Sequence, residues 1–252
     1  MGLPSSRKPA LDAIAAYTNW YHRIELAPGV VTPGTNDSDS VLEMLDLPFS
    51  LRGKRVLDIG TRDGYFAFEA EKRGAEVLAV DYVPAAATGF ALAAEILQSR
   101  VTYVQENIYN CTPERFGKFD IVFMLGLLYH LRDPLGALDI LHDLCTDQAF
   151  IETYVCDDQI FLADGTTVPL AAVDSRLPAT PLMAFLPGMS LNADPTNFWA
   201  PNTSCVKAML REANFKVLAV KRVENRAIVK AEIASDEETL YHRRIARGEM
   251  QP

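Results

Sequence analysis

Residues 54–65 read KRVLDIGTRDGY, and this stretch decides the fold class. A strand is predicted over Arg55–Ile59, where charged residues give way to an apolar run. A helix is predicted over Tyr65–Arg73, because apolar residues recur on one helical face. Gly60 and Gly64 lie between the two, where glycine permits a tight turn and a close approach of the backbone to a ligand. Strand, turn and helix together predict a nucleotide-type cradle with free N–H groups at the start of the helix.

The composition limits the class of protein. The chain has 252 residues, 49% of them hydrophobic and 23% charged, as in an ordinary globular protein. Its length fits one α/β domain with appendages, and two small domains are the alternative. No apolar run reaches the length of a membrane span, and residues 1–10 lack the apolar core of a signal peptide. We therefore expect a cytoplasmic protein without membrane contact.

The formal net charge of −9 bears on the partners of the protein. Proteins that grip a nucleic-acid backbone usually gather Lys and Arg side chains to neutralise phosphates. Here the basic residues are scattered, with the densest group at 242–247, so the composition counts against RNA or DNA. The four cysteines form no CxxC pair and have no histidine at zinc-finger spacing. We therefore expect reduced thiols and no metal site.

From residue 55 to about 155, short apolar runs alternate with helical patterns, which predicts a parallel sheet. Two later runs, joined through Glu224 and Asn225, predict an antiparallel hairpin. We therefore predict an α/β, Rossmann-like sheet of seven mostly parallel strands, with an antiparallel last strand, helices on both faces and an N-terminal helical lid. The predicted strands are Arg55–Ile59, Glu76–Val80, Val101–Gln105, Phe119–Leu125, Ala149–Val155, Lys216–Val223 and Arg226–Ile233. The predicted helices are Ala10–His22, Val41–Leu45, Tyr65–Arg73, Ala85–Gln98, Pro134–Leu144 and Ser204–Glu212.

The same pattern divides the chain into five regions. Residues 1–50 form the N-terminal helical lid or substrate region, and residues 51–156 form the Rossmann-like cofactor-binding core. Residues 157–202 are rich in proline and show little periodicity, so we expect an irregular insertion that covers the site. Residues 203–234 supply the C-terminal helix and closing strands. Residues 235–252 form a charged tail.

Asp81 ends the second predicted strand and Asp58 lies near the end of the first. Ligands of an open parallel sheet bind beyond the carboxyl ends of its strands, so Asp81 faces the same crevice as the glycine turn. A carboxylate there accepts both hydroxyls of a ribose, which fits a dinucleotide or S-adenosylmethionine. The turn lacks the Gly-x-Gly of a pyrophosphate site and has Arg62 at its middle, while Asp58 suits an ammonium group. These features favour the adenosyl sulfonium; the alternative is an ordinary turn with helix-capping carboxylates.

Residues 119–134, FDIVFMLGLLYHLRDP, place a glycine at a strand end and then a Tyr-His pair. With residues 106–108, ENI, this segment resembles class I S-adenosylmethionine-dependent methyltransferases. The Tyr-His-x-x-x-Pro pattern more narrowly resembles the tRNA wobble-uridine 5-oxyacetic acid methyltransferase-like family, as do WYHRIEL at 20–26, TPG at 32–34 and NFWAPN at 197–202. The resemblance covers roughly residues 15–155 and, more weakly, 195–232.

The resemblance implies a set of residues around a bound S-adenosylmethionine. The glycine turn would line the methionine end, with Asp58 near the amino group and Asp81 on the ribose. Tyr82 would flank the adenine, and the glycine after the fourth strand would leave room for the reacting methyl group. The implied cofactor-binding residues are Asp58, Gly60, Arg62, Gly64, Asp81, Tyr82, Asn107, Ile108 and Gly126.

Two histidines are candidate catalytic bases or acceptor-orienting groups, because histidine titrates near working pH. His130 follows the fourth predicted strand, and its alternative role is to cap the helix that begins near Asp133. His22 lies on the predicted N-terminal helix, where ordinary packing is the alternative. The candidate walls of an acceptor pocket are Trp20, Thr32, Tyr129 and Trp199.

We therefore expect an enzyme that transfers a methyl group from S-adenosylmethionine to an oxygen or nitrogen of a small-molecule acceptor. A tRNA acceptor is the alternative, although residues 50–54, SLRGK, lack the Trp- and Lys-rich pattern that the tRNA enzymes carry before the glycine turn. An NAD(P)-dependent oxidoreductase and a non-catalytic nucleotide-binding module are further alternatives. The sequence leaves the oligomeric state open, a homodimer included.

Overall fold

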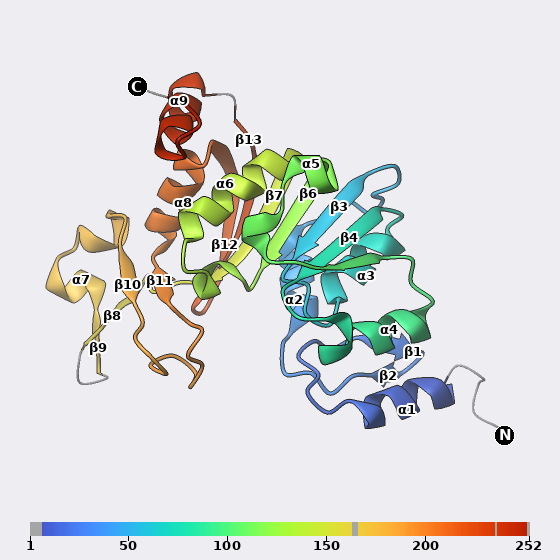
Figure 1. Ribbon diagram of the computed structural model, residues 1–252. Coiled ribbons are helices and arrows are strands. Elements are labelled where there is room, and N and C mark those ends of the chain that lie inside the picture. The colour runs from blue at the N-terminus through green and yellow to red at the C-terminus, as the bar shows by residue number, and fades with distance from the viewer. Residues whose placement is uncertain (1–6, 163–165, 235, 251–252) are drawn as a thin grey trace. The chain divides into compact units, whose positions relative to one another are not determined.

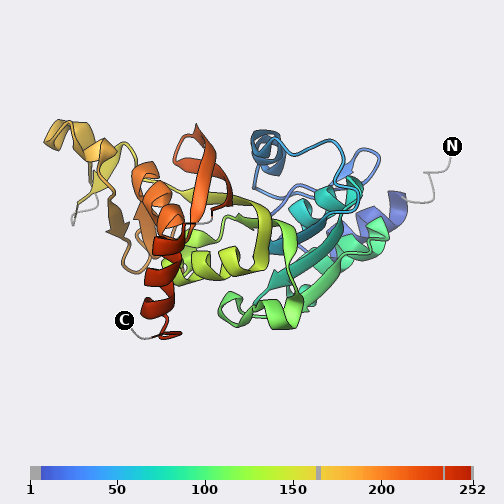
Figure 2. The ribbon, with the colours of Figure 1, turned by 90° about the horizontal axis from the view of Figure 1, so that it is seen from above.

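The computed structural model describes residues 7–162, 166–234 and 236–250. The chain divides into two compact units, Met1–Phe123 (unit 1) and Met124–Pro252 (unit 2). Seven strands belong to one sheet (Figures 1 and 2). Their order across the sheet is β12 (Phe215–Val223), β13 (Arg226–Ile233), β7 (Cys145–Tyr154), β6 (Phe119–Leu125), β3 (Arg55–Ile59), β4 (Glu76–Asp81) and β5 (Thr102–Gln105).

The directions of these strands agree with the prediction. β3, β4 and β5 run parallel to one another, while β13 is antiparallel to both β7 and β12. Helices pack on the sheet: α3 (Tyr65–Lys72) lies against β3 and β4, α6 (Pro134–Leu144) against β7, and α8 (Thr203–Glu212) against β12. The predicted Rossmann-like α/β sheet, seven-stranded and mostly parallel, is confirmed.

Unit 1 places the glycine turn between a buried strand and a buried helix face. Val56, Leu57 and Ile59 of β3 are buried. Phe66 and Phe68 of α3, which follows the turn, are buried as well. The other elements of this unit are α1 (Arg7–Ala16), β1 (Glu25–Ala27), β2 (Val30–Val31), α2 (Ser38–Leu45), η1 (Ala85–Ala87), α4 (Phe90–Leu97), η2 (Ile108–Asn110) and α5 (Pro113–Phe116).

The predicted helix Ala10–His22 was wrong at its C-terminal end. The helix stops at Ala16, and residues 17–22 form an irregular segment before the small β1–β2 hairpin. The backbone N–H groups of Tyr21 and His22 donate to the carboxylate of Asp63, at 2.6 and 3.0 Å. They are therefore not available to a helix, and the cause lies about forty residues away in the sequence.

The predicted helix Ala85–Gln98 is interrupted for a similar reason. It divides into η1 and α4 at Thr88 and Gly89. The N–H of Gly89 donates to Asp63 at 2.9 Å, and the hydroxyl of Thr88 donates to the carbonyl of Arg62 at 2.9 Å. Contacts with the glycine turn thus replace helical hydrogen bonds at this point.

Unit 2 begins inside β6 and contains two well-capped helices. Asp133 caps α6 by accepting from the N–H of Gly136, and Asn202 caps α8 by accepting from the N–H of Cys205. The remaining elements of this unit are η3 (Leu128–His130), β8 (Gln159–Phe161), β9 (Thr167–Pro169), α7 (Leu170–Val173), η4 (Leu177–Ala179), β10 (Met183–Phe185), β11 (Trp199–Pro201) and α9 (Glu237–Ala246).

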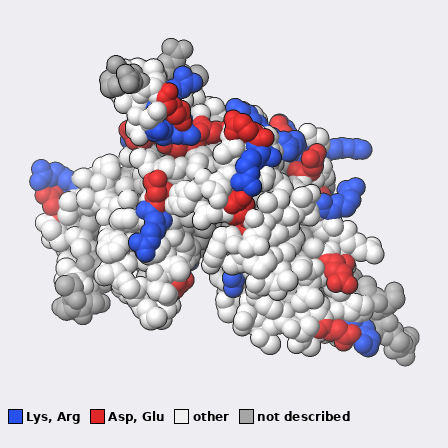
Figure 3. Space-filling view, viewed as in Figure 1, with Lys and Arg blue, Asp and Glu red and all other residues white. Residues whose placement is uncertain are grey.

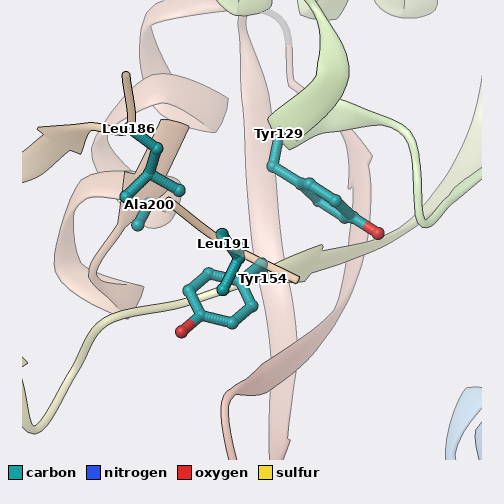
Figure 4. Packing of buried hydrophobic residues seen from close by; sticks show 5 residues of the cluster. All are labelled: Tyr129, Tyr154, Leu186, Leu191 and Ala200. Atoms are coloured by element: carbon teal, nitrogen blue, oxygen red, sulfur yellow. The ribbon is translucent and has the colours of Figure 1, made fainter. Parts of the chain in front are cut away.

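Residues 157–202 are more regular than their sequence predicts. They contain two antiparallel hairpins, β8–β9 and β10–β11. Each strand has only three residues, too few for a periodic pattern. Leu186, Leu191 and Ala200 of this region pack with Tyr129 and Tyr154 in a buried cluster (Figure 4). Residues 186–200 of this region therefore contribute to the core of unit 2.

Residues 237–246 of the predicted charged tail form helix α9, which is attached by ion pairs. Arg243 is only 8% exposed at its side chain, and its guanidinium lies 2.8 Å from Asp139 and 3.0 Å from Asp143 of α6. Arg247 adds a 2.6 Å pair with Asp143. Figure 3 displays acidic and basic side chains next to one another on the face that it shows. Over the described ranges, no helix is long and apolar enough to cross a membrane.

Candidate functional site

Two buried carboxylates lie at neighbouring strand ends in unit 1. Asp58 of β3 is 2% exposed, and Asp81, the last residue of β4, is 7% exposed. The strands are in register, with Ile59 opposite Val80, and the N–H of Gly60 donates to the carbonyl of Val80 at 2.8 Å. The glycine turn therefore leaves β3 alongside the end of β4, where both carboxylates are found.

The turn adopts three left-handed backbone conformations. The φ angles of Gly60, Arg62 and Gly64 are +79°, +53° and +93°. The N–H of Arg62 donates to Asp81 at 2.9 Å, which joins the turn to the end of β4. A Cβ on Gly64 would lie 2.6–2.8 Å from ring atoms of Phe68 and Phe90. Both its conformation and its packing thus require glycine at this position.

Asp58 can change its charge near neutral pH. Burial raises the pKa of Asp58 to about 7, and the charge of Asp81 adds to the increase. The hydroxyl of Thr61 donates to Asp58 at 2.7 Å, which acts in the opposite direction. An ammonium group beside Asp58 would favour its ionised form. Thr61 was missed in the sequence, although a hydroxyl residue three positions after a strand-end carboxylate was a usable signal.

Asp63 is the most connected residue of the turn and was also missed. Its side chain is fully buried. One carboxylate oxygen accepts from the N–H groups of Tyr21 and His22, and the other accepts from the N–H of Gly89. Asp63 therefore joins the turn to the N-terminal segment and to the start of α4.

The backbone of His22 is hydrogen-bonded to Asp63, and its ring lies against the first turn of α3. The ring lies 6.1 Å from that of Tyr65 and 5.8 Å from that of Phe66, centre to centre. The residue is 5% exposed, and no described residue pairs with its Nδ1. Burial lowers the pKa of His22 to about 4, while Asp63 acts in the opposite direction. The imidazole is therefore neutral at neutral pH.

Thr32 and Trp20, two predicted acceptor-pocket residues, are buried in unit 1. The hydroxyl of Thr32 donates to the carbonyl of His22 at 2.6 Å and accepts from the N–H of Ile24 at 2.8 Å. The indole of Trp20 covers Gly89 so closely that an added Cβ would overlap it. In the described chain, the indole N–H of Trp20 has no hydrogen-bond partner. Both residues therefore shape the N-terminal segment.

The residues predicted beside the adenine lie at the ends of β4 and β5. Tyr82 follows Asp81 and is 69% exposed, so one ring face is accessible. Asn107 is exposed and caps η2 by accepting from the N–H of Tyr109 at 3.1 Å, while Ile108 is buried. The N–H of Glu106 donates to the carbonyl of Asp81 at 2.8 Å. Except for Gly126, the predicted cofactor residues therefore lie in unit 1, at or after the ends of the neighbouring strands β3, β4 and β5.

Gly126 belongs to a polar group in unit 2. It follows β6 with φ +75°, and its N–H donates to the carbonyl of Glu152 at 3.0 Å. The guanidinium of Arg226 donates to the hydroxyl of Tyr129 at 3.0 Å and lies 3.3 Å from the Glu152 carboxylate. Burial raises the pKa of Glu152, and Arg226 acts against it. Glu152 and Arg226 were missed in the sequence. Glu152 lies on β7 and Arg226 on β13, and the two residues meet only in the folded sheet.

His130 and Trp199 are both tied by hydrogen bonds within unit 2. The Nδ1 of His130 lies 2.9 Å from the hydroxyl of Thr196, and burial lowers the pKa of His130. Asp133 caps α6, so the capping alternative for His130 was wrong. The indole N–H of Trp199 donates to the carbonyl of Leu131 at 2.9 Å, and its ring meets the exposed ring of Phe185 edge-on.

Comparison with known proteins identifies the family. The model of the methyltransferase domain family matches residues 38–220. The tRNA U34 carboxymethyltransferase of Dichelobacter nodosus is 38% identical over 119 residues, which cover 45% of this chain and 37% of that protein. The ubiquinone biosynthesis O-methyltransferase of Vibrio parahaemolyticus is 34% identical over 98 residues, 39% of this chain and 40% of that protein. The matches span about two fifths of these relatives.

Solved structures share the fold at low identity. The N-terminal domain of EvdMO1, determined with SAH and D-fucose, is 15% identical with a TM-score of 0.60, covering 93% of this chain and 98% of that one. Magnesium protoporphyrin IX methyltransferase from Synechocystis PCC 6803, determined with SAM, is 16% identical with a TM-score of 0.53, covering 78% and 77%. The prediction of a class I S-adenosylmethionine-dependent methyltransferase is confirmed at the level of family and fold. Because the family model covers most of its residues, the chain belongs to the methyltransferase domain family.

Proposed function

We propose that this chain binds S-adenosylmethionine at the strand ends of unit 1 and transfers its methyl group to an oxygen or nitrogen of a small-molecule acceptor. The pair of buried carboxylates, Asp58 and Asp81, beside a left-handed turn carries the proposal. Such a pair suits a ligand with one cationic end and a ribose. It repels the pyrophosphate of a dinucleotide, which disfavours the oxidoreductase alternative.

The residues of the site fit the parts of this cofactor. Asp58, with its pKa of about 7, would ionise beside the ammonium of the methionine moiety. One oxygen of Asp81 accepts from Arg62. Among the described residues, the other oxygen has only a 3.4 Å contact from the N–H of Val83, so it can accept from a ribose hydroxyl. The exposed ring of Tyr82 can stack on adenine. When bound, S-adenosylmethionine supplies a methyl group activated by positive sulfur.

The protein therefore mainly aligns the acceptor and, for a hydroxyl acceptor, removes its proton. His130 is the preferred base of the two histidines. It is neutral at neutral pH because burial lowers its pKa, and its Nδ1 is oriented by Thr196, which leaves Nε2 to accept a proton. His22 is neutral too, but it is more deeply buried among aromatic rings. Tyr129 and Trp199 remain the proposed walls for the acceptor.

A small molecule is favoured over tRNA because many described basic residues are already paired with acids. Arg55 pairs with Glu76, Arg115 with Glu106, and Arg222 with Asp157. Such pairs leave less positive charge for phosphates. The tRNA acceptor stays the second candidate, because the relative from Dichelobacter nodosus is named for it. The proposal places the reaction in the cytoplasm.

Calorimetric titration with S-adenosylhomocysteine tests the cofactor site. We expect the wild type to bind and Asp81→Asn to bind at least about tenfold more weakly, because it loses a charged hydrogen-bond acceptor. Glu95→Gln, which removes a charge from the exposed side of α4, is the matched control and should bind like the wild type. Equal affinity of Asp81→Asn and the wild type would contradict the assignment.

Transfer of a labelled methyl group tests the acceptor. The purified protein is incubated with labelled S-adenosylmethionine and either a fraction of small metabolites or total tRNA. We expect label in the metabolite fraction and its loss with Asp81→Asn. Label in tRNA alone would establish the second candidate instead.

A further inference from the structure

Asp63 connects three segments of unit 1, because its carboxylate accepts hydrogen bonds from backbone N–H groups of two other segments. It accepts hydrogen bonds from the N–H groups of Tyr21, His22 and Gly89, at 2.6, 3.0 and 2.9 Å, and its side chain is fully buried. An ionised carboxylate accepts hydrogen bonds and donates none, so three converging N–H groups suit it. Burying a carboxylate is costly unless it is paired in this way, so the three contacts are mutually dependent.

Asp63 also lies within the glycine turn, which is hydrogen-bonded to Asp81 at the end of β4. Its neighbour Arg62 donates its N–H to Asp81 and accepts the hydroxyl of Thr88 through its carbonyl. Arg62 and Gly64, on either side, have left-handed backbones. A non-glycine residue holds such a backbone only when surrounding contacts fix it. Asp63 supplies contacts of that kind to the turn.

The N-terminal segment is fixed by the same carboxylate. The N–H of His22 is bound by Asp63 and its carbonyl by Thr32, so both backbone groups of His22 are held. Trp20 covers Gly89, whose N–H is the third donor to Asp63. Trp20, Gly89 and Asp63 thus form one joint between residues 20–22 and the turn.

We propose, resting on the function proposed above, that Asp63 is a positioning residue that couples order in residues 20–22 to cofactor binding at the glycine turn. Loss of the joint frees the N-terminal segment and lets the turn leave its left-handed conformation. Affinity then falls in proportion to the fraction of molecules that keep the binding-competent turn.

Hydrogen–deuterium exchange with and without S-adenosylhomocysteine, combined with calorimetry, tests the coupling. In the wild type we expect slow exchange over residues 17–24 and slower exchange with the ligand. In Asp63→Asn one amide NH₂ must face a backbone N–H. We expect exchange there about tenfold faster, affinity about tenfold weaker, and little further protection by the ligand. Asp12→Asn, on the exposed surface of α1, is the matched control and should behave like the wild type.

The outcomes separate the two proposals. Unchanged exchange in Asp63→Asn overturns the joint. Faster exchange with unchanged affinity overturns the coupling and leaves a merely structural role. Failure of the wild type to bind the ligand overturns the cofactor site, while exchange in the free protein still tests the joint. If Asp63→Asn does not fold, Gly89→Ala is used in its place. Its Cβ overlaps Trp20 and so disrupts the same joint, and we expect the same changes in exchange and affinity.

Discussion

At the scale of the residue, the proposed contact of Asp58 with the cofactor predicts that cofactor affinity depends on pH. Its pKa of about 7 in the free protein means that it is mostly protonated at pH 6 and mostly ionised at pH 8. An ammonium ligand selects the ionised form, so we expect S-adenosylhomocysteine to bind up to about tenfold more tightly at pH 8 than at pH 6. Calorimetry at both pH values measures this. Asp58→Asn should bind weakly and lose the dependence; the same slope in that variant would assign the titration to another group.

His22 gives a second residue-scale prediction, on stability. Its folded pKa of about 4 lies below its ordinary value of 6.5, so between these pH values the unfolded chain binds a proton that the folded chain does not. Stability from the neutral ring is therefore complete above pH 6.5 and lost as the pH falls towards 4. From pH 7.5 to 5, the wild type should lose about 2 kcal/mol more than His22→Gln. Urea unfolding at both pH values measures the difference, and equal losses would contradict it.

The sequence could predict the position of residues that lie at strand ends. Asp58 and Asp81 lie at strand ends, and the pattern of β3 and β4 located those ends. It could not predict Asp63, whose partners are backbone groups of residues 21, 22 and 89. Backbone donors leave no side-chain signature. The Arg226–Glu152 pair was hidden for a related reason, because it joins two strands far apart in the sequence.

At the scale of the element, most strands and the helix Pro134–Leu144 agree with the prediction, whereas β7 begins at Cys145 and not at the predicted Ala149. β3, β6 and β13 begin and end where predicted, because each contains a run of buried apolar residues. Hydrogen bonds to Asp63 instead keep residues 21–22 out of the predicted N-terminal helix and accompany the break before α4. A periodic pattern reports which face of a helix is buried, and it says nothing of a distant group that captures an N–H.

Helix α9 provides the element-scale prediction. Its attachment depends on Arg243, which also lies 3.2 Å from the carbonyl of Asp139 and 3.4 Å from that of Ala213. Arg243→Ala removes the cation beside the carboxylate of Asp139, while Asp143 keeps its pair with Arg247, so we expect a loss of about 2–4 kcal/mol in the free energy of unfolding. Arg244→Ala, on the exposed side of the same helix, should change it by less than about 0.5 kcal/mol.

Urea unfolding and limited proteolysis of α9 measure both variants. We expect cleavage within residues 237–250 to be faster in Arg243→Ala than in Arg244→Ala. Equal stability and equal cleavage of the two variants would show that the ion pairs do not hold the helix. The exposed pair between Arg247 and Glu249 cannot substitute for them, because surface pairs contribute little.

At the scale of the whole molecule, the charges favour the proposed small acceptor over tRNA. The net charge is −9, and in the described part of the chain basic residues from both units are engaged with carboxylates. A phosphate backbone must displace such ion pairs before it can form its own ion pairs with the basic residues. The remaining acidic residues also repel it. A small acceptor, as proposed, needs neither step.

The expected result is therefore methyl transfer that barely responds to salt. Between about 50 and 200 mM salt, an enzyme that contacts 6–10 phosphates loses about 10³–10⁵ in affinity. We expect labelling of the small-metabolite fraction to change by less than about twofold over this range, because few ion contacts are broken. Filter binding of total tRNA should show no retention at either concentration. Retention at about 50 mM that disappears at about 200 mM would place the acceptor among nucleic acids, because only released counterions give so steep a dependence.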